Sequence, residues 1–217
     1  SIDKNEAMLF ASEQIPGEVL HEGDNIKVYV SDVINGDRRC SLKVTRTHKE
    51  LVKRLFEMEV PEIFEGTVEV KSISREAGSR TKIAVYSKDP NVDPVGACIG
   101  QRNSRVASIV RELNGEKIDI IKYSENPAEF IAAALAPSSV IRVDILNPEE
   151  RSCRAIVPDD QLSLAIGNKG QNAKLAARLT GYKIDIRPVS SDIPEEPEEE
   201  ALEEVLPQKD ELVQEIE

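Results

Sequence analysis

The chain has 217 residues but no tryptophan, and only 4% of its residues are aromatic. Its hydrophobic cores must therefore be aliphatic, and stacking on aromatic rings can add little to the binding of a nucleic acid. The sequence also lacks an apolar run near the ~20 residues that cross a bilayer, and it lacks an N-terminal signal-peptide pattern. We expect no membrane association and a cytoplasmic location.

Histidine and cysteine are scarce, and neither forms a cluster. His21 and His48 stand alone, and Cys40, Cys98 and Cys153 are odd in number, far apart and without C-x-x-C spacing. This pattern argues against a zinc site or a disulfide framework and favours a reducing compartment. No set of paired carboxylates or of Ser, His and Asp is evident either. We therefore predict a protein without a cofactor, a metal or enzymatic activity.

Negative charge is concentrated at one end of the chain. The formal net charge is -12, but residues 189–217 hold 12 of the 40 acidic groups and only Lys209 of the 28 basic ones. The other 188 residues carry 28 acidic and 27 basic groups, a net charge of -1, so an anionic partner is not excluded. The Glu- and Pro-rich composition from residue 189 onward predicts a disordered acidic tail. Alternatively, this tail docks on a basic partner or shields a binding surface of the same chain.

The most informative feature is an internal repeat, which covers residues 99–120 and 164–186. Ile-Gly opens both copies, and Leu-x-Gly-x-Lys-Ile-Asp-Ile closes both, with one more residue between these motifs in the first copy. In the second copy, Asp159 is expected to cap a short helix that Gly167 ends, and Leu175, Ala176 and Leu179 recur at helical spacing up to Gly181. Each copy therefore predicts a helix, a tight loop, a second helix and a strand.

The two loops carry the chemistry of the repeat. Gly167-Asn168-Lys169-Gly170 precedes a helix whose unpaired N–H groups and dipole favour anions, and Lys169 adds a full positive charge. Glycines without a Cβ also let another chain approach closely. This is the form of the GXXG loop with which KH domains clamp a nucleic-acid backbone. The first copy has Asn103 in place of the second glycine, and because asparagine tolerates left-handed backbone, the loop should keep its shape and bind more weakly, or rely more on Arg102 and Arg105.

The N-terminal 47 residues read as β-strands. Residues 26–30 and 40–44 alternate, Asn35-Gly36 is a strong hairpin turn, and residues 6–9 form a possible short strand. Three strands do not close a five-stranded barrel. We therefore expect residues 1–47 to be the second half of an OB-like (S1) domain whose first strands lie outside this sequence; a self-sufficient small β meander is the alternative.

Two units with the same order of elements follow. The first begins with an amphipathic helix that places Leu51, Leu55 and Met58 on one face and that Pro61 stops or redirects. Two strands, the helix-loop-helix and a final strand come next; residues 127–188 repeat the order. The last two strands of each unit flank a helical crossover, so they should be parallel neighbours. The linker is so short that the two units should be locked together, with their grooves in one continuous track.

The expected architecture is α+β and resembles one family. It has a partial S1 barrel at 1–47, tandem type II KH domains at 48–124 and 125–188, and the acidic tail at 189–217. The segments that carry the resemblance are residues 12–18, 46–48, 59–63, 78–86, 89–100 and 115–120. They resemble the S1-KH-KH portion of the NusA family of bacterial transcription termination/antitermination factors. The resemblance implies binding of nascent RNA during pausing, termination and antitermination, with RNA polymerase contacted mainly by an N-terminal domain outside this sequence. Asn103 departs from the family's usual glycine.

The partners expected from this resemblance are single-stranded RNA, RNA polymerase and other termination or antitermination factors, with the chain itself a monomer. We expect bases to be read against residues 117–121 and 183–187, over a floor that includes Ile99 and Ile166. The predicted RNA-binding residues are Gly100, Gln101, Arg102, Asn103, Arg105, Gly167, Asn168, Lys169, Gly170 and Lys174. Two alternatives remain: the KH/S1 module of a phosphorolytic exoribonuclease, and a protein-interaction scaffold whose KH folds have lost RNA.

Overall fold

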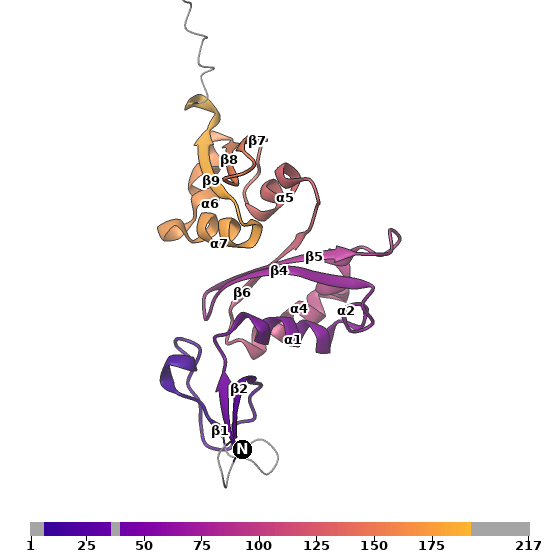
Figure 1. Cartoon of the computed structure of the whole chain (residues 1–217), viewed down its shortest axis with the longest axis vertical. Helices are drawn as coiled ribbons and strands as arrows, with labels where there is room; N and C mark the ends of the chain where they lie inside the picture. The colour runs from indigo at the N-terminus through magenta and orange to yellow at the C-terminus, as the bar shows by residue number, and fades with distance from the viewer. Residues whose placement is uncertain (1–6, 36–39, 192–217) are drawn as a thin grey trace, which may run out of the picture.

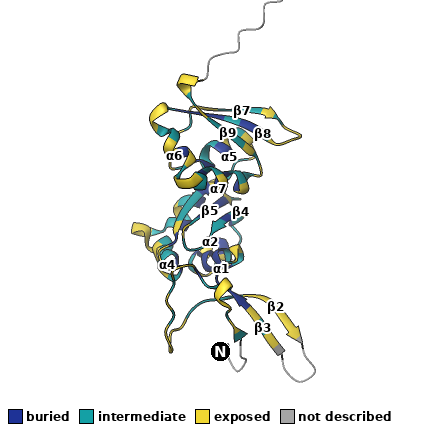
Figure 2. Cartoon of the chain, turned by 90° about the vertical axis from the view of Figure 1, so that its left-hand side faces the viewer, coloured by how far each residue is buried: buried dark blue, intermediate teal, exposed yellow. Residues whose placement is uncertain are grey.

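The computed structural model describes residues 7–35 and 40–191. Its elements form successive layers along the long axis (Figures 1 and 2). A small N-terminal sheet lies at one end; next come the helices and then the sheet of the first KH unit, followed by the helices and the sheet of the second. Each KH sheet is three-stranded, and a helical layer separates the two sheets.

The N-terminal sheet is open. Its strands are β1 (Ala7–Met8), β2 (Tyr29–Asn35) and β3 (Cys40–Thr45) in the order β1-β3-β2, with β1 parallel and β2 antiparallel to β3. The described strands therefore do not close a barrel. The strand predicted from Ile26 begins only at Tyr29. The backbone of Lys27 instead accepts a hydrogen bond from Arg46 and donates one to the Glu112 carboxylate, so it bonds to the first KH unit. The predicted turn at Asn35-Gly36 extends beyond the described residues.

The first KH unit has the predicted order of elements. They are α1 (Lys49–Glu59), α2 (Pro61–Phe64), β4 (Val68–Glu76), β5 (Arg80–Ser87), α3 (Pro94–Ile99), α4 (Ser104–Glu112) and β6 (Lys117–Lys122). The strand order is β4-β5-β6, with β5 and β6 parallel as predicted. Pro61 starts α2 directly after α1, which confirms its expected role.

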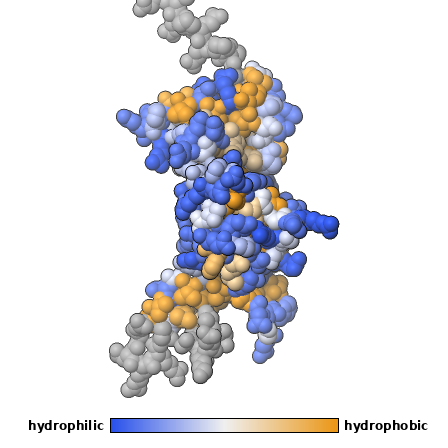
Figure 3. All heavy atoms as spheres, turned by 90° about the vertical axis from the view of Figure 1, so that its right-hand side faces the viewer, coloured by the Kyte–Doolittle hydropathy of each residue, from blue (hydrophilic) through white to orange (hydrophobic). Residues whose placement is uncertain are grey.

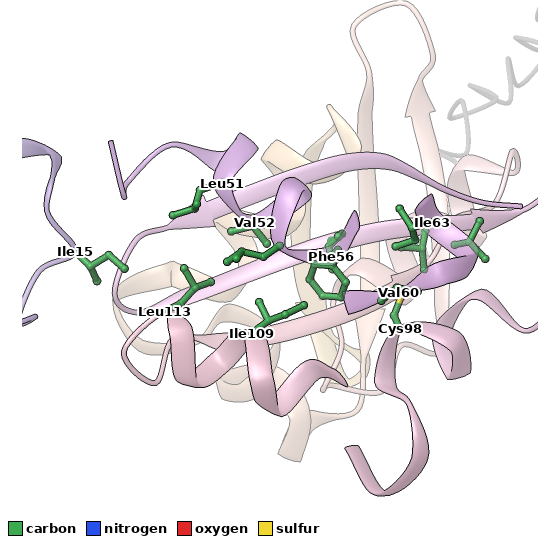
Figure 4. Packing of buried hydrophobic residues seen from close by; sticks show 13 residues of the cluster. Ile15, Leu51, Val52, Phe56, Val60, Ile63, Cys98, Ile109 and Leu113 are labelled. Atoms are coloured by element: carbon green, nitrogen blue, oxygen red, sulfur yellow. The ribbon is translucent and has the colours of Figure 1, made fainter. Parts of the chain in front are cut away.

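The core of this unit lies between its helices and one face of its sheet (Figure 4). Phe56 is its largest apolar side chain, packed among aliphatic residues such as Ile109 and Leu113. The face predicted for α1 was wrong at one position: Met58 is 66% exposed, and the buried stripe consists of Leu51, Val52, Leu55 and Phe56. Met58 points to solvent because the next turn of chain, at Val60 and Ile63, fills the core at that end.

The second KH unit repeats the first. Its elements are α5 (Pro127–Ala134), β7 (Arg142–Asn147), β8 (Ser152–Val157), α6 (Leu162–Ile166), α7 (Gln171–Thr180) and β9 (Lys183–Pro188), in the strand order β7-β8-β9. Gly167 and Gly181 end α6 and α7 as predicted. Asp159 was wrongly expected to cap α6: it lies inside a 3₁₀ turn, and its carboxylate accepts hydrogen bonds from the backbone and side chain of Ser190.

The two KH units share a buried surface. Helix α7 lies across β4 and β5, and the second hydrophobic core includes Ala84 and Ile121 from the first unit. Polar contacts join the same surfaces: Lys82 Nζ donates to the Ala136 carbonyl at 2.6 Å, and Gln171 Nε2 donates to Glu76. The sheet of the first unit is thus covered on both faces, which confirms that the units are locked together.

The N-terminal sheet is attached to the first KH unit by one buried arginine. Arg46 is 1% exposed; it forms ion pairs with Glu18 at 2.6 Å and Glu112 at 3.1 Å and donates to the Glu112 carbonyl. Burial opposes the charge of Arg46, but these two carboxylates raise its pKa. Ile15 also enters the core of the KH unit. Both contacts hold the sheet against the ends of α1 and α4.

Candidate nucleic-acid interface

The two repeat loops have the same backbone conformation. Gly100 has φ 73° and ψ 174°, and Gly167 has φ 76° and ψ 172°. At the next-to-last position of the loop, Arg102 and Lys169 both have φ 51°. The last position is left-handed in both, although one copy has Asn103 and the other Gly170. The prediction that asparagine preserves the turn is therefore confirmed.

A charged residue in left-handed backbone is unusual and costs free energy. Arg102 and Lys169 both adopt it, both are exposed, and neither forms an ion pair within the described part of the chain. Packing of these side chains therefore does not explain the strain. The conformation places a cation at the tip of each loop, next to the start of the following helix.

The helices that follow the loops begin without side-chain caps. His48, Asp93 and Asn126 accept hydrogen bonds from the first-turn amides of α1, α3 and α5. Neither Asn103 before α4 nor Gly170 before α7 does so. The N–H groups of Ser104 and Gln171 already donate to the carbonyls of Gln101 and Asn168. The amides that follow them in each first turn have no side-chain cap and, with the positive end of the helix dipole, favour an anion.

The first glycine of each loop is required by the protein itself. The combination of φ near 75° and ψ near 170° is almost confined to glycine. A Cβ at Gly167 would also lie 2.8 Å from the backbone N of Asn172, and one at Gly100 would lie 2.7 Å from Cγ of Arg105. The close approach inferred from sequence thus involves the next helix of the same chain, not only an external ligand.

The last position of the loop has more space. A Cβ at Gly170 would meet only Lys174 Cε, at an ordinary 3.6 Å. This accounts for Asn103 in the first copy, because a side chain at this position has no backbone to displace.

Arg105 and Asn172 occupy equivalent positions, and both hold the loop in place. Arg105 pairs with Glu62 in α2 at 2.9 Å and donates to the Ala97 carbonyl at 2.6 Å. Asn172 is 3% exposed and donates to the carbonyls of Leu135 and Ala165. Each residue ties its loop to the preceding short helix and to the element before the sheet. Arg105, predicted from sequence as a phosphate contact, thus already has two partners inside the protein.

Six of the ten predicted site residues line two separate surface pockets. Gly100, Gln101 and Arg105 line a pocket of about 570 Å³ beside the first loop. Asn168, Lys169 and Lys174 line one of about 360 Å³ beside the second loop. Lys174 Nζ donates to the Lys169 carbonyl at 3.1 Å and remains exposed. The two loops are thus open to solvent, each with its own hollow.

Residues of the first unit form one wall of the second pocket, which sequence reasoning missed. Glu76 and Ser79, at the β4–β5 turn, line it. Gln171, the residue after the loop, donates to the Glu76 carboxylate at 2.5 Å and to Ser79 Oγ at 2.7 Å. Nothing local in the sequence could have indicated this contact, because it joins positions more than 90 residues apart.

The shared closing motif of the repeat, Gly-x-Lys-Ile-Asp-Ile, has structural roles. Glu116 is fully buried and accepts hydrogen bonds from Arg75, from the Gly78 amide and from Thr81. Asp119 pairs with Arg80 at 2.6 Å and with Lys82 at 3.1 Å. Burial would raise the pKa of Asp119, but these two cations hold it below its usual range. The motif therefore positions β6, an outer strand of the first sheet.

The described residues show no group of three or more His, Cys, Asp or Glu side chains placed to hold a metal ion. Cys98 and Cys153 are buried and unpaired. Burial raises the pKa of Cys98 to about 12 and that of Cys153 to about 11, so neither is a thiolate at neutral pH. Within residues 7–35 and 40–191, no helix has the length and apolar character needed to cross a membrane.

Comparison with known proteins agrees with this architecture. The profile of the NusA-like first KH domain matches residues 46–123, and that of the NusA-like second KH domain matches residues 127–192. The chain is 55% identical over 186 residues to a protein of Halalkalibacterium halodurans named transcription termination/antitermination protein NusA; the match covers 86% of this chain and 48% of that one.

Proteins of the same name give similar matches in other bacteria. The identity is 56% over 187 residues in Bacillus subtilis, covering 86% of this chain and 50% of the relative. It is 50% over 183 residues in Thermus thermophilus, covering 84% and 47%. The chain thus spans about half the length of these relatives. Its two KH units, their order and the matched sequences show that it belongs to the NusA family.

Proposed function

We propose that this chain binds single-stranded RNA through its two repeat loops, as part of a factor that acts on nascent RNA in transcription termination and antitermination. The observation that supports this most directly is the pair of loops with the same backbone conformation, each with an exposed cation in the left-handed region before an uncapped helix. The names of the relatives supply the cellular process. RNA supplies the anion and the unpaired bases that such loops recognise in KH domains.

In the proposed mechanism, phosphates and bases are bound by different parts of each unit. The first-turn amides of α4 and α7, with Arg102, Lys169 and Lys174, contact phosphates. Bases lie against the edge strands β6 and β9, over aliphatic side chains such as Ile166, which is 38% exposed. About four nucleotides per KH unit is the usual reach, so the two units together would hold about eight.

Arg105 has a smaller part in this mechanism than Arg102. A phosphate contact would compete with its ion pair to Glu62 and its hydrogen bond to the Ala97 carbonyl. We therefore assign Arg105 mainly to positioning the first loop. With the side chain of Asn103 in place of the second glycine, the first loop should bind RNA more weakly than the second.

The test is a double substitution at the tip of each loop. Asn168→Asp with Lys169→Asp should abolish RNA binding by the second unit without unfolding it, because both side chains are exposed and lack structural partners among the described residues. The matched variant, Gln101→Asp with Arg102→Asp, should reduce affinity less. Filter binding to short single-stranded RNA at several salt concentrations provides the measurement. Each lost phosphate contact should lower the slope of log affinity against log salt by about 0.7.

Unchanged affinity in the second-loop variant, with an unchanged unfolding midpoint, would reject the proposed site. Unchanged affinity in both variants would favour the scaffold function, in which the KH folds no longer bind RNA. The exoribonuclease alternative is disfavoured by the tandem NusA-like KH match. An exoribonuclease of this kind would degrade RNA in the presence of phosphate, and a gel would detect the loss of full-length RNA.

The N-terminal sheet is proposed to be part of an S1-type OB barrel. It is open, and several large apolar residues on this unit are exposed, including Val33 at 50%, Phe10 at 53% and Met8 at 64%. Figure 3 shows this apolar surface at the lower end of the molecule. A closed barrel would cover such a face. Contacts with RNA polymerase and with other termination or antitermination factors are proposed for the whole protein, of which this chain corresponds to about half.

A further inference from the structure

Three aromatic rings gather at one end of β6, in a chain that has only four Phe and four Tyr residues. Tyr86 lies near the end of β5, Tyr123 directly follows β6, and Phe130 lies in α5. The rings of Tyr86 and Tyr123 are 6.2 Å apart and almost perpendicular, at 89°. Phe130 packs against Tyr123 with ring centroids 5.0 Å apart. The scarcity of aromatic residues makes this grouping the main potential stacking site of the KH units.

Two of these rings face an open pocket. Tyr86 and Tyr123 line a hollow of about 500 Å³ together with Val92, Pro94 and Lys122. This volume lies within the range of roughly 300–1,000 Å³ that small-molecule sites occupy. Phe130 is 7% exposed and supports Tyr123 from behind. The pocket therefore has an aromatic corner that is packed against α5 of the second unit.

The ring faces at this corner already hold a cation. Lys71 Nζ lies 5.0 Å from the ring centroid of Tyr86 and 5.9 Å from that of Tyr123. The side chain of Lys71 is 36% exposed, and Tyr86 as a whole residue is also 36% exposed. Lys71, which also pairs with Glu69 at 2.7 Å, lies over these faces in the free chain, so a group that stacks there has to displace it. Planar or cationic groups are the ones that such faces attract.

The pocket lies at the ends of two elements of the first KH unit. Lys122 is the last residue of β6, an outer strand of the sheet, and Pro94 is the first residue of α3. Helix α3 then leads to the loop that starts at Gly100. Its six residues correspond to about 9 Å of helix, so the aromatic corner lies about one short helix beyond the loop.

The charges around the pocket favour a base over a phosphate. Asp89 and Asp93 line it, and both carboxylates are engaged: Asp89 accepts hydrogen bonds from Asn91, and Asp93 caps α3. Their negative charge opposes a phosphate inside the pocket, whereas Lys122 at the rim is exposed and can pair with one outside. A neutral, planar ligand with a phosphate on its outer side fits both observations.

We propose that the corner formed by Tyr86 and Tyr123 is a stacking subsite for one nucleobase of the bound RNA, next to the nucleotides held by the first loop. The inference rests on the RNA-binding function proposed above and adds a contact to it. A base stacked on an aromatic side chain is worth about 1–3 kcal/mol. The subsite should therefore raise the affinity for an RNA long enough to reach it by about fivefold or more.

The experiment compares oligoadenylates of about eight nucleotides, the expected reach of two KH units, with ones longer by about two nucleotides at the 5′ or the 3′ end. We expect one of the longer RNAs to bind about fivefold more tightly to the unmodified chain. Tyr86→Leu should remove this gain and leave the affinity for the shorter RNA unchanged. Tyr86→Phe should keep the gain, because it keeps the ring.

Tyrosine fluorescence gives a second readout, which affinity alone does not provide. The chain lacks tryptophan, and its four tyrosines are Tyr29, Tyr86, Tyr123 and Tyr182. A variant with Tyr29→Phe and Tyr182→Phe emits only from the two rings of the corner. Its emission should be quenched by the longer RNA and not by the shorter one. A longer RNA with 2-aminopurine at the added end should show quenching of that base as well.

The outcomes separate the subsite from the proposed function. If no added nucleotide improves affinity or quenches tyrosine, while the Asn168→Asp and Lys169→Asp variant still loses the shorter RNA, the subsite is rejected and the RNA-binding function stands. The subsite is also rejected if Tyr86→Leu lowers thermal stability but leaves the gain in affinity intact, because the rings then serve only packing between the units. If oligoadenylate and mixed-sequence RNA of both lengths fail to bind the unmodified chain, both proposals are wrong.

Discussion

The two KH units place the same sequence motif in different environments. Gly-x-Lys-Ile-Asp-Ile puts Asp119 on β6 and Asp185 on β9, opposite Lys82 and Arg154 respectively. Lys82 is fully buried and Asp119 is 20% exposed, whereas Arg154 and Asp185 are 31% and 45% exposed. The difference arises because helices of the second unit cover the first sheet, while the outer face of the second sheet is open (Figure 2).

The comparison shows how one repeat acquired two roles. In the first unit the ion pair of Lys82 and Asp119 lies at the interface between the two units, where Lys82 also donates to the Ala136 carbonyl of the second unit. Burial lowers the pKa of Lys82, although Asp119 opposes this effect. In the second unit the equivalent pair is a surface feature, and such pairs contribute little. The first unit therefore buries its ion pair beneath the second unit, whereas the second unit leaves the equivalent pair open to solvent.

Removal of the two aspartates is the strongest way to test this contrast. Asp119→Ala leaves Arg80 and the buried Lys82 without a carboxylate and should lower the free energy of unfolding by about 2–4 kcal/mol, since breaking a buried pair is costly. Asp185→Ala, the matched change, should cost less than about 1 kcal/mol. Urea titration measures both. Adding Lys82→Met to Asp119→Ala should restore part of the loss, and equal effects of the two aspartates would contradict the contrast.

The two glycines of the second loop should differ as well. Gly167→Ala introduces a Cβ that meets the backbone of Asn172 at 2.8 Å in a conformation almost confined to glycine. It should destabilise the chain by about 2–3 kcal/mol. Gly170→Ala meets no backbone and should cost about 1 kcal/mol for its left-handed conformation. Thermal unfolding of the two variants tests whether Gly167→Ala is the more destabilising change. An equal loss of stability would show that the backbone strain, and not the contact with Asn172, sets the cost.

An exchange of residues between the loops tests why they should differ in RNA affinity. Gly170→Asn gives the second loop the residue of the first; it should leave stability within about 1 kcal/mol and weaken RNA binding several-fold, because the side chain lies in front of the helix. Asn103→Gly should strengthen binding by the first loop. Filter binding with the opposite loop inactivated measures each effect. If Gly170→Asn binds RNA as well as the unmodified chain does, Asn103 does not lower the RNA affinity of the first loop.

The smallest expected effect is on the pH dependence of stability. Asp119 has a lower pKa in the folded chain than its ordinary value of 3.8. The stabilisation that it contributes is therefore present above about pH 4 and is lost as pH falls below that value, through the folded pKa. Asp119→Ala should flatten the decline of stability below pH 4. Urea titrations of both proteins at a series of acidic pH values measure how the free energy of unfolding declines with pH. If the decline is as steep in the variant, other carboxylates cause it.

Several errors in the sequence-based interpretation have one physical cause. Met58 fits the apolar period of α1, yet it points to solvent because residues after Pro61 fill the core. Residues 26–28 alternate like a strand, yet the backbone of Lys27 bonds to Arg46 and Glu112. Arg105 stays a predicted phosphate contact, but its partners inside the protein, Glu62 and the Ala97 carbonyl, were not foreseen. In each case a residue distant in sequence supplies the partner that local pattern cannot reveal.

The sequence by itself determined the repeat, the order of its elements and the shape of both loops, because helix caps, glycine positions and apolar periods act within a few residues. It also indicated that Asn103 would keep the turn. Only the tertiary structure decided which ion pairs are buried, that Glu76 and Ser79 border the second loop, and that three aromatic rings meet at the end of β6. These features depend on how one folded unit covers another, and that contact brings together residues that no local rule connects.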